Sequence, residues 1–209
     1  MPEVFISYSR KDVAFAHILV EALKLNQLET WIDWEDIPPS ADWRDEIHRA
    51  IEAADTFVYI VSQHSKDSQV CGEEVQHAIE NNKRLVPIVI QPEIRPEELP
   101  ARLAAVNWIF FPSAEGLSPQ AGEFQQAFDK LLQAIRTDLD WAKAHTRLQV
   151  RALEWQKNQR ESSFVLRGRE LHEAEAWLAQ AGDKKEPRPT ELQRQYLLAS
   201  RKDADRRQR

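Results

Sequence analysis

The sequence predicts a doubly wound α/β domain, in which helices cover both faces of a five-stranded parallel sheet, followed by an α-helical tail. Three observations support this prediction. Segments with strand character alternate five times with segments whose apolar residues recur at helical spacing. The connections between them are short, which is typical of parallel sheets built from β–α–β units. After residue 137 the strand-type segments stop, and only helical patterns remain.

The first strand is predicted at residues 4–7, and a helix over residues 12–26 follows it at once. Ser9 and Asp12 offer side-chain oxygens that can cap the N-terminus of this helix. Ligand sites of open α/β sheets lie outside the carboxyl ends of the strands, so we expect this turn to border a ligand site. Hydroxyl groups and positive charges would crowd that edge and suit an anionic ligand: Ser7, Ser9, Arg10 and Lys11.

The other elements of the sheet follow in the same alternation. Four further strands are predicted from short runs of strand-forming residues, at 29–32, 56–61, 85–90 and 106–111. Pro87 places the fourth strand near an edge or a bulge. Residues 34–41 form a loop rich in helix breakers, and 62–68 a polar loop. Apolar stripes predict the intervening helices, over about 43–54, 71–79, 96–103 and 124–135.

From residue 138 the pattern changes to a long amphipathic helix. Its apolar residues alternate steps of four and three along the chain: Trp141, His145, Leu148, Ala152 and Trp155. We divide the chain into a domain over 1–137, a helical extension over 138–181, a linker over 182–189 and a basic C-terminal helix over 190–209. The tail contains too few apolar residues to form a core alone, so we expect it to pack on itself, on the first domain or on another copy.

Composition and charge exclude several classes of protein. The 209 residues carry a net charge of −6, which argues against a nucleic-acid binder, although residues 190–209 carry a local +3. The single cysteine, Cys71, excludes an intrachain disulfide and a cysteine-based zinc site, and it fits a reducing cytoplasm. No run approaches the roughly 18 apolar residues of a membrane span, and the N-terminus lacks a signal segment. We therefore expect a soluble cytoplasmic protein with no metal site.

Most familiar catalytic motifs are absent. None of the five glycines follows the first strand, which excludes the P-loop and the dinucleotide-binding fingerprint, and no Gly-x-Ser-x-Gly elbow occurs. Glu74 and His77 have the spacing of a di-iron ligand pair, but such a site needs a second copy on another helix. Two surface residues are the simpler interpretation. Cys71 lies on the apolar stripe and is best read as a small buried residue.

Glu74 is the titratable residue that stands out. It flanks the apolar stripe of its helix, so we expect its carboxylate at the border of the core and partly desolvated. Its helix begins just after the third strand, so Glu74 can face the same sheet edge as Ser9 and Arg10. From the pattern alone, a glutamate on the helix surface is the simpler interpretation. Trp34 and Trp43 flank the loop with two prolines, where either could stack on a base or hold the loop down.

Taken together, these segments resemble the Toll/interleukin-1 receptor (TIR) family, and specifically its bacterial branch. Residues 5–12 resemble the opening box of that family. Residues 33–40 resemble its second-strand exit and BB loop, with Pro39-Ser40 in place of the usual Pro-Gly. Residues 62–74 resemble its Ser-rich loop and Cys-x-x-Glu helix, and residues 110–112 its final aromatic box. The resemblance covers residues 1–137 and implies the flavodoxin-like TIR fold.

The resemblance also implies a function. Many members of this family hydrolyse or cyclise NAD⁺ with a single glutamate, whose position matches Glu74. Ligand-lining positions would fall on Ser9, Arg10, Asp33 and Trp43, and the BB loop used in self-assembly would contain Asp36, Ile37, Pro38, Pro39 and Ser40. NAD⁺ is then a substrate, and no cofactor is implied. The chemistry agrees, because the ribose–nicotinamide bond breaks through an oxocarbenium-like state, neutral nicotinamide leaves without a general acid, and one carboxylate can stabilise the positive charge.

Three functions remain open from the sequence. The first is an NAD⁺ glycohydrolase or cyclase that is switched on when TIR domains assemble in bacterial signalling or defence. The second is a non-enzymatic adaptor that binds other TIR domains, and the third is a helical dimerisation or membrane-surface element in the tail. Residues 153–155, 162–168 and 189–201 resemble, more loosely, the segment after the TIR domain in large bacterial sensor proteins. That likeness implies a sensor or membrane element in a longer parent protein, with residues 206–209 as a basic cluster at the inner membrane face.

Overall fold

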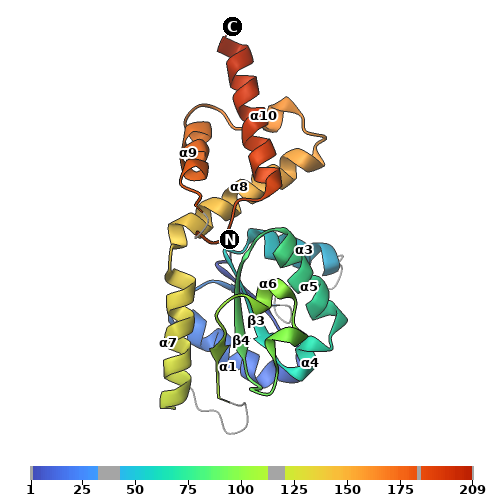
Figure 1. Ribbon diagram of the computed structural model, residues 1–209, viewed down its shortest axis with the longest axis vertical. Coiled ribbons are helices and arrows are strands. Elements are labelled where there is room, and N and C mark those ends of the chain that lie inside the picture. Colours follow the sequence, from blue (N-terminus) through green and yellow to red (C-terminus); the bar gives the residue numbers. More distant parts are fainter. Residues whose placement is uncertain (1, 33–42, 113–120, 183–184, 209) are drawn as a thin grey trace. The chain divides into compact units, whose positions relative to one another are not determined.

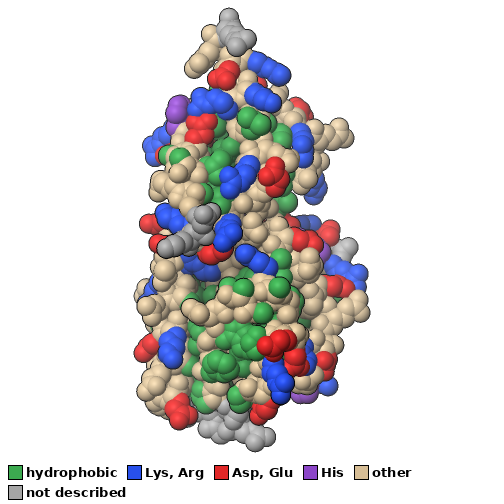
Figure 2. Space-filling view, in the orientation of Figure 1, with side chains coloured by type: hydrophobic (Ala, Val, Ile, Leu, Met, Phe, Trp, Pro, Cys, Tyr) green, Lys and Arg blue, Asp and Glu red, His purple; other side chains and the backbone are tan. Residues whose placement is uncertain are grey.

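The computed structural model describes residues 2–32, 43–112, 121–182 and 185–208 (Figure 1). The chain divides into two compact units, one ending at Leu139 and the other beginning at Asp140. We call them the sheet unit and the helical unit. The face shown in Figure 2 carries Lys and Arg side chains interspersed with Asp and Glu, without a large field of one sign. No helix in the described part of the chain combines the length and apolar character needed to cross a membrane.

The sheet unit contains one five-stranded sheet in the order β2-β1-β3-β4-β5, and every pair is parallel. This confirms the predicted doubly wound architecture. The strands are β1 (Val4–Ser7), β2 (Thr30–Trp31), β3 (Thr56–Val61), β4 (Arg84–Val89) and β5 (Ile109–Phe110). The edge strands β2 and β5 are shorter than the predicted 29–32 and 106–111. Pairing of β4 with β5 begins at Ile88, one residue after Pro87.

Helices cover both faces of the sheet, and the alternation of side chains along the strands determines which residues face which layer. Val4 and Ile6 point into the core under α1 and α7, whereas Phe5 points into the core under α3, α5 and α6. The helical segments are η1 (Arg10–Asp12), α1 (Val13–Leu25), α3 (Trp43–Ala53), α4 (Gln63–Lys66), α5 (Gln69–Glu80), η2 (Pro96–Glu98), α6 (Ala101–Ala104) and α7 (Gly122–Arg136).

The polar loop predicted over residues 62–68 is wrong, because residues 63–66 form the short helix α4. Two serines explain the helix. The Ser62 hydroxyl accepts a hydrogen bond from the Ser65 backbone N–H at 3.0 Å, and the Ser65 hydroxyl accepts one from the Ser62 N–H at 2.9 Å. This reciprocal capping satisfies two backbone donors that a helix N-terminus otherwise leaves unpaired. No apolar stripe accompanies these serines, so the sequence pattern alone does not predict the helix.

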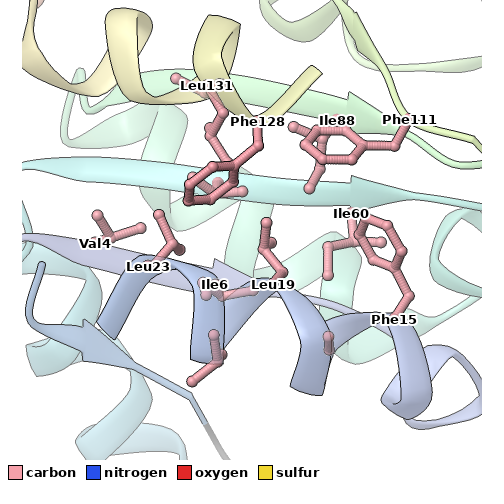
Figure 3. Close-up of a cluster of buried hydrophobic side chains, with 14 of the residues drawn as sticks. Val4, Ile6, Phe15, Leu19, Leu23, Ile60, Ile88, Phe111, Phe128 and Leu131 are labelled. Carbon is pink, nitrogen blue, oxygen red and sulfur yellow. The ribbon is translucent and has the colours of Figure 1, made fainter. Parts of the chain in front are cut away.

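The core on the α1 and α7 side of the sheet is almost entirely aliphatic and aromatic (Figure 3). Ile6 and Ile60 come from neighbouring strands, and Leu19 of α1 packs onto them without solvent exposure. Phe15 meets Phe111 edge-on, with ring centroids 5.4 Å apart. Each fully buried side chain of this size contributes about 1.5–3 kcal/mol of transfer free energy. The strands therefore form a rigid platform for the loops at their ends.

A buried lysine, Lys83, directly precedes the first residue of β4. Lys83 is only 2 % exposed, and its ammonium donates a hydrogen bond of 2.9 Å to the carbonyl of Glu52, in the last turn of α3. Burial lowers the pKa of Lys83 to about 8, and the nearby carboxylates of Asp55 and Glu52 oppose that shift. A cation is well placed at the C-terminal end of a helix, where carbonyl groups concentrate.

The helical unit consists of α8 (Leu139–Lys157), η3 (Ser162–Phe164), α9 (Gly168–Ala179) and α10 (Glu191–Gln208). The expectation that the tail has too few apolar residues for a core is wrong. A few large aromatic side chains supply the missing area: Trp141, Trp155, Trp177 and Tyr196. Trp141 and Trp177 stack with centroids 4.5 Å apart, and the Trp141 indole N–H donates to the Pro187 carbonyl at 2.9 Å.

Buried polar side chains join α10 to α8 inside this unit. The Thr190 hydroxyl donates to Gln149 Oε1 at 2.7 Å and accepts from the Gln193 backbone N–H at 3.1 Å. The Gln193 side chain donates to the His145 carbonyl at 2.9 Å. Thr190 therefore acts as the N-cap of α10 and as a tether to α8.

We expect that replacing Lys83 weakens the pH dependence of the free energy of unfolding in the alkaline range. The pKa of Lys83 is about 8 in the folded chain and near 10.5 in the unfolded chain, so the unfolded chain binds more protons between these values. The free energy of unfolding of the wild type should therefore rise relative to Lys83→Met between pH 8 and 10.5, by on the order of 3 kcal/mol. Urea unfolding of both proteins at several pH values measures this, and a constant difference would contradict it.

We also expect Thr190→Ala to destabilise the helical unit by about 1–2 kcal/mol, because it removes a helix cap and leaves buried Gln149 without this donor. Thr190→Ser keeps the hydroxyl and is the matched control, so it should recover most of the loss. Thermal unfolding of the three proteins, followed by circular dichroism in the far ultraviolet, measures the difference, because the described part of the helical unit contains three α-helices. Equal destabilisation by both variants would show that the methyl group matters instead of the hydroxyl.

Candidate active site at the carboxyl edge of the sheet

The carboxyl ends of β1 and β3 form the topological switch point of the sheet. The chain leaves β1 toward β2 on one side, and it leaves β3 toward β4 on the other side. In doubly wound sheets the two departing connections leave a crevice between them, and ligands bind there. Ser7 is the last residue of β1 and lies opposite Tyr59 of β3 in the register of the pair. The side chains around these two residues make up the candidate site.

Glu74 reaches this edge from α5. The buried residues of α5 are Cys71, Glu74, Val75 and Ala78, so Glu74 lies on the buried stripe of the helix and is only 6 % exposed. It is therefore more deeply placed than the border position that the sequence predicts. The Ser7 hydroxyl, which is 1 % exposed, donates a hydrogen bond to Glu74 Oε2 at 2.5 Å. Ser68 caps the N-terminus of α5 and accepts from the Cys71 N–H at 3.3 Å.

A second serine–carboxylate pair lies at the same edge. Ser62, which directly follows β3, donates its hydroxyl hydrogen to Asp12 Oδ2 at 2.5 Å. Asp12 occupies the N-cap position of α1, but within the described chain its side chain makes no capping hydrogen bond, contrary to the sequence prediction. The reason is that its carboxylate turns across the edge toward Ser62. This pair joins the turn after β1 to the turn after β3.

Tyr59 of β3 lies opposite Ser7 and is close enough to Glu74 and Asp12 for both carboxylates to act on it. Burial raises the pKa of Tyr59 to about 12, and the Cys71, Glu74 and Asp12 side chains add to the shift, while a hydrogen bond with Ser65 opposes it. The phenol therefore keeps its proton at neutral pH. It provides a neutral hydroxyl in a place where a second anion would repel the carboxylates.

Some of the predicted ligand-lining residues lie near this edge. Ser9 follows Ser7 by two residues, is partly buried, and accepts from the Lys11 N–H at 3.4 Å as the cap of η1. Arg10 is exposed. Trp43 is the first residue of α3, is 40 % exposed, and has the Arg44 guanidinium 5.2 Å from its ring centroid. The remaining predicted residues lie outside the described residues: Asp33, Asp36, Ile37, Pro38, Pro39 and Ser40.

Glu74 and His77, which have the spacing of a di-iron ligand pair, contact different partners. His77 Nε2 lies 3.0 Å from Glu52 Oε1, and the His77 ring stacks on His48 with centroids 4.1 Å apart. Glu74, in contrast, contacts Ser7. Sequence reasoning missed Ser7 as the donor to Glu74, as well as Ser62 and Tyr59. A signal for Ser7 was present, because strand alternation puts it on the same face as Phe5, the face that α5 covers.

A profile of the TIR domain family matches residues 4–132. The chain belongs to the TIR domain family. No curated protein matches it. The fold resembles the TIR domain of the Toll-related receptor TRR-2 from Hydra magnipapillata, at a TM-score of 0.53 and 19 % identity over 65 % of this chain and 99 % of that chain.

Two further solved structures share the TIR fold. One is a metazoan TIR-STING receptor from C. gigas in complex with 2',3'-cGAMP, at a TM-score of 0.53 and 21 % identity over 65 % of this chain and 39 % of that chain. The other is a structure of the TIR domains of the activated Roq1 resistosome, which directly recognises the pathogen effector XopQ. It matches at a TM-score of 0.53 and 16 % identity. That match covers 65 % of this chain and 99 % of that chain. At these identities the likeness concerns the fold.

Proposed function

We propose that the TIR domain cleaves the bond between nicotinamide and ribose in NAD⁺, as a glycohydrolase or a cyclase, with Glu74 as the catalytic residue. The observation that carries the proposal is a carboxylate that is 6 % exposed, held by Ser7 at the carboxyl edge of the sheet. A buried carboxylate is costly to a fold unless it is paired, so its presence at a ligand-binding edge favours a role in chemistry. NAD⁺ is the substrate, and the reaction requires no cofactor.

The reaction places specific demands on the protein. As the C–N bond breaks, its electron pair moves to the pyridinium ring, so nicotinamide leaves as a neutral molecule and needs no proton. Positive charge then develops on the ribose ring, as in glycoside hydrolysis. A nearby carboxylate stabilises that charge, and the effect is larger in a site shielded from water. Attack by water gives ADP-ribose, and attack by a group of the same nucleotide gives a cyclic product.

The neighbouring residues have roles in binding in this proposal. Trp43 presents an exposed indole that can stack on a base of the dinucleotide. Arg10 supplies a cation for the diphosphate, next to Ser9 on the same turn. Asp33 would line the ligand at the end of the second strand. Binding of this kind orients the ribose toward Glu74 and lowers the entropic cost of reaching the transition state.

We further propose that activity depends on assembly of several TIR domains through the BB loop at residues 36–40, in bacterial signalling or defence. The likeness to the TIR domains of the Roq1 resistosome, an assembled state, supports this part of the proposal. Assembly in the cytoplasm, or at the inner face of a membrane in a longer parent protein, would bring the loop of one copy to the site of another.

A second candidate function is a non-enzymatic adaptor that acts by binding other TIR domains. Phe110 on the edge strand β5 is 57 % exposed, and its ring lies 6.3 Å from that of Trp108. Figure 2 shows hydrophobic side chains gathered on the face of the sheet unit that lies over β4 in Figure 1. An apolar patch of this kind is suited to protein binding whether or not Glu74 is catalytic.

We expect the assembled protein to release nicotinamide from NAD⁺ and Glu74→Gln to be slower by roughly 10²–10³-fold, because the amide lacks the stabilising charge. Gln is nearly the same size and can still accept the hydrogen bond from Ser7. Glu73→Gln is the matched control: it lies on the same helix, is partly exposed and pairs with Gln69 instead of the site. Nicotinamide release should be followed over a wide protein concentration range with a crowding agent.

Two results would count against this proposal in different ways. If visibly assembled wild-type protein releases no nicotinamide, the adaptor becomes the leading function. If Glu74→Gln is as active as the wild type while Glu73→Gln is not, the catalytic residue has been assigned to the wrong position.

Trp43→Ala should raise KM for NAD⁺ by about tenfold and leave kcat nearly unchanged, because stacking binds the ground state and the transition state alike. Trp43→Phe keeps an aromatic face and should restore most of the affinity. Steady-state kinetics on the three proteins measure both constants. A fall in kcat without a change in KM would argue that Trp43 acts on assembly or on the fold.

A further inference from the structure

The hydroxyl of Ser7 is the feature of the site that the proposed reaction leaves unexplained. Ser7 is 1 % exposed at the end of β1, and the neighbouring positions of this strand face are filled by large rings, Phe5 on β1 and Tyr59 on β3. An apolar side chain would suit such a position by packing alone. The serine instead donates its single hydroxyl hydrogen to Glu74 Oε2 at 2.5 Å.

This contact has two physical consequences for the carboxylate. A hydroxyl that donates to a carboxylate stabilises its ionised form, and such charge-assisted bonds are stronger than neutral ones. The donor also comes from an inner strand of the sheet, and Ser7 itself is paired with Tyr59 of β3, which sets its position. The hydrogen bond thereby holds the flexible Glu74 side chain in one rotamer.

We propose that Ser7 is the positioning residue of Glu74, which fixes the orientation of the carboxylate and keeps it ionised at the sheet edge. The inference rests on the proposed function, because Ser7 acts through Glu74 and has no part in bond cleavage itself. It assigns the last residue of β1 to the reaction, in addition to Ser9 and Arg10 in the following turn.

Other ionisable groups around Glu74 are compatible with this role. From β3, Tyr59 stays protonated at neutral pH, with its pKa raised to about 12. On α5 itself, Cys71 is buried on the same stripe, and Glu73 points toward Arg44 of α3 with a closest approach of 4.0 Å. From the turn after β1, Asp12 is held by Ser62. The tyrosine, the cysteine and Asp12 bring no positive charge to Glu74, whereas the hydrogen bond from Ser7 favours its ionised form.

The test compares Ser7→Ala with Ser62→Ala in the full chain under assembling conditions. Ser62 is the matched control, because it also donates to a carboxylate at 2.5 Å, at the same edge and with 0 % exposure, but its partner is Asp12. Ser7→Ala should move the acidic limb of kcat/KM upward by about one pH unit. It should also lower kcat roughly tenfold with little change in KM, because a loosely held carboxylate is less often in the productive orientation.

Variants that keep a donor should recover these effects in order of donor strength. Ser7→Thr retains a hydroxyl on a residue that suits a strand, and it should restore the acidic limb. Ser7→Cys has a similar shape and a weak donor, so it should show a smaller shift in the same direction, and it replaces Ser7→Ala if the alanine variant does not fold. Ser62→Ala should lower stability and leave the acidic limb unchanged, which separates positioning from a general structural effect.

A measurement without substrate distinguishes failure of this inference from failure of the proposed function. The titration midpoint of the Glu74 carboxyl can be followed by ¹³C NMR and assigned by comparison with Glu74→Gln. An active wild type together with an unchanged midpoint and pH profile in Ser7→Ala would overturn the role of Ser7 and leave the proposed reaction in place. An inactive wild type with a raised midpoint in Ser7→Ala would support the positioning role and reject the reaction.

Discussion

A carboxylate removed from water must find a hydrogen-bond donor, and this constraint on Glu74 connects the parts of the sheet unit. The donor is Ser7, the last residue of a strand that is paired with β3 along its whole length. The remaining buried residues of α5 pack on the same face of the sheet as Phe5. The apolar stripe of α5 sets the helix against the sheet, and the hydrogen bond from Ser7 to Glu74 fixes one point of its register along β1. Together they bring one carboxylate to the switch point.

The two ends of the sheet use polar groups in different ways. At the amino end, the buried ammonium of Lys83 binds a carbonyl at the end of α3. At the carboxyl end, two hydroxyl–carboxylate pairs join the end of β1 and the turn after it to the segment that follows β3. The first arrangement satisfies backbone groups and stabilises the fold. The second leaves negative charge where ligands of open α/β sheets bind, which is an arrangement suited to function.

Much of the architecture could be predicted from the sequence, because strand runs and helical stripes follow directly from apolar burial. The order of the elements, the parallel sheet and the buried stripe of α5 belong to this class. The edge strands were predicted too long, since β-forming residues such as Trp108 also serve as packing residues outside a strand. α4 was missed because its stability comes from the side-chain caps of Ser62 and Ser65, which leave no periodic signal.

The candidate site was only partly predictable. Glu74 could be singled out from its position relative to the stripe, and Ser9 and Arg10 from their place after the first strand. Strand alternation places Ser7 on the face that α5 covers, but its contact with Glu74 also depends on how α5 is rotated on the sheet, which the sequence does not encode locally. Asp12 shows the same limit: its position before a helix predicts a cap, but a long-range donor competes successfully for the carboxylate. The core of the helical unit was underestimated because residue counts give too little weight to the area that a tryptophan buries.

The double use of Ser62 has a consequence for how this domain can vary. Its hydroxyl accepts the backbone N–H of Ser65, in the first turn of α4, and gives its only hydrogen to Asp12, so one side chain completes a helix terminus and a bridge between two turns. Loss of the hydroxyl leaves a helix end uncapped and a carboxylate without this donor. Positions 12 and 62 are therefore coupled, and homologous domains that lose the acid at one should also change the residue at the other. The turn after β1 and the turn after β3 should therefore change together in evolution.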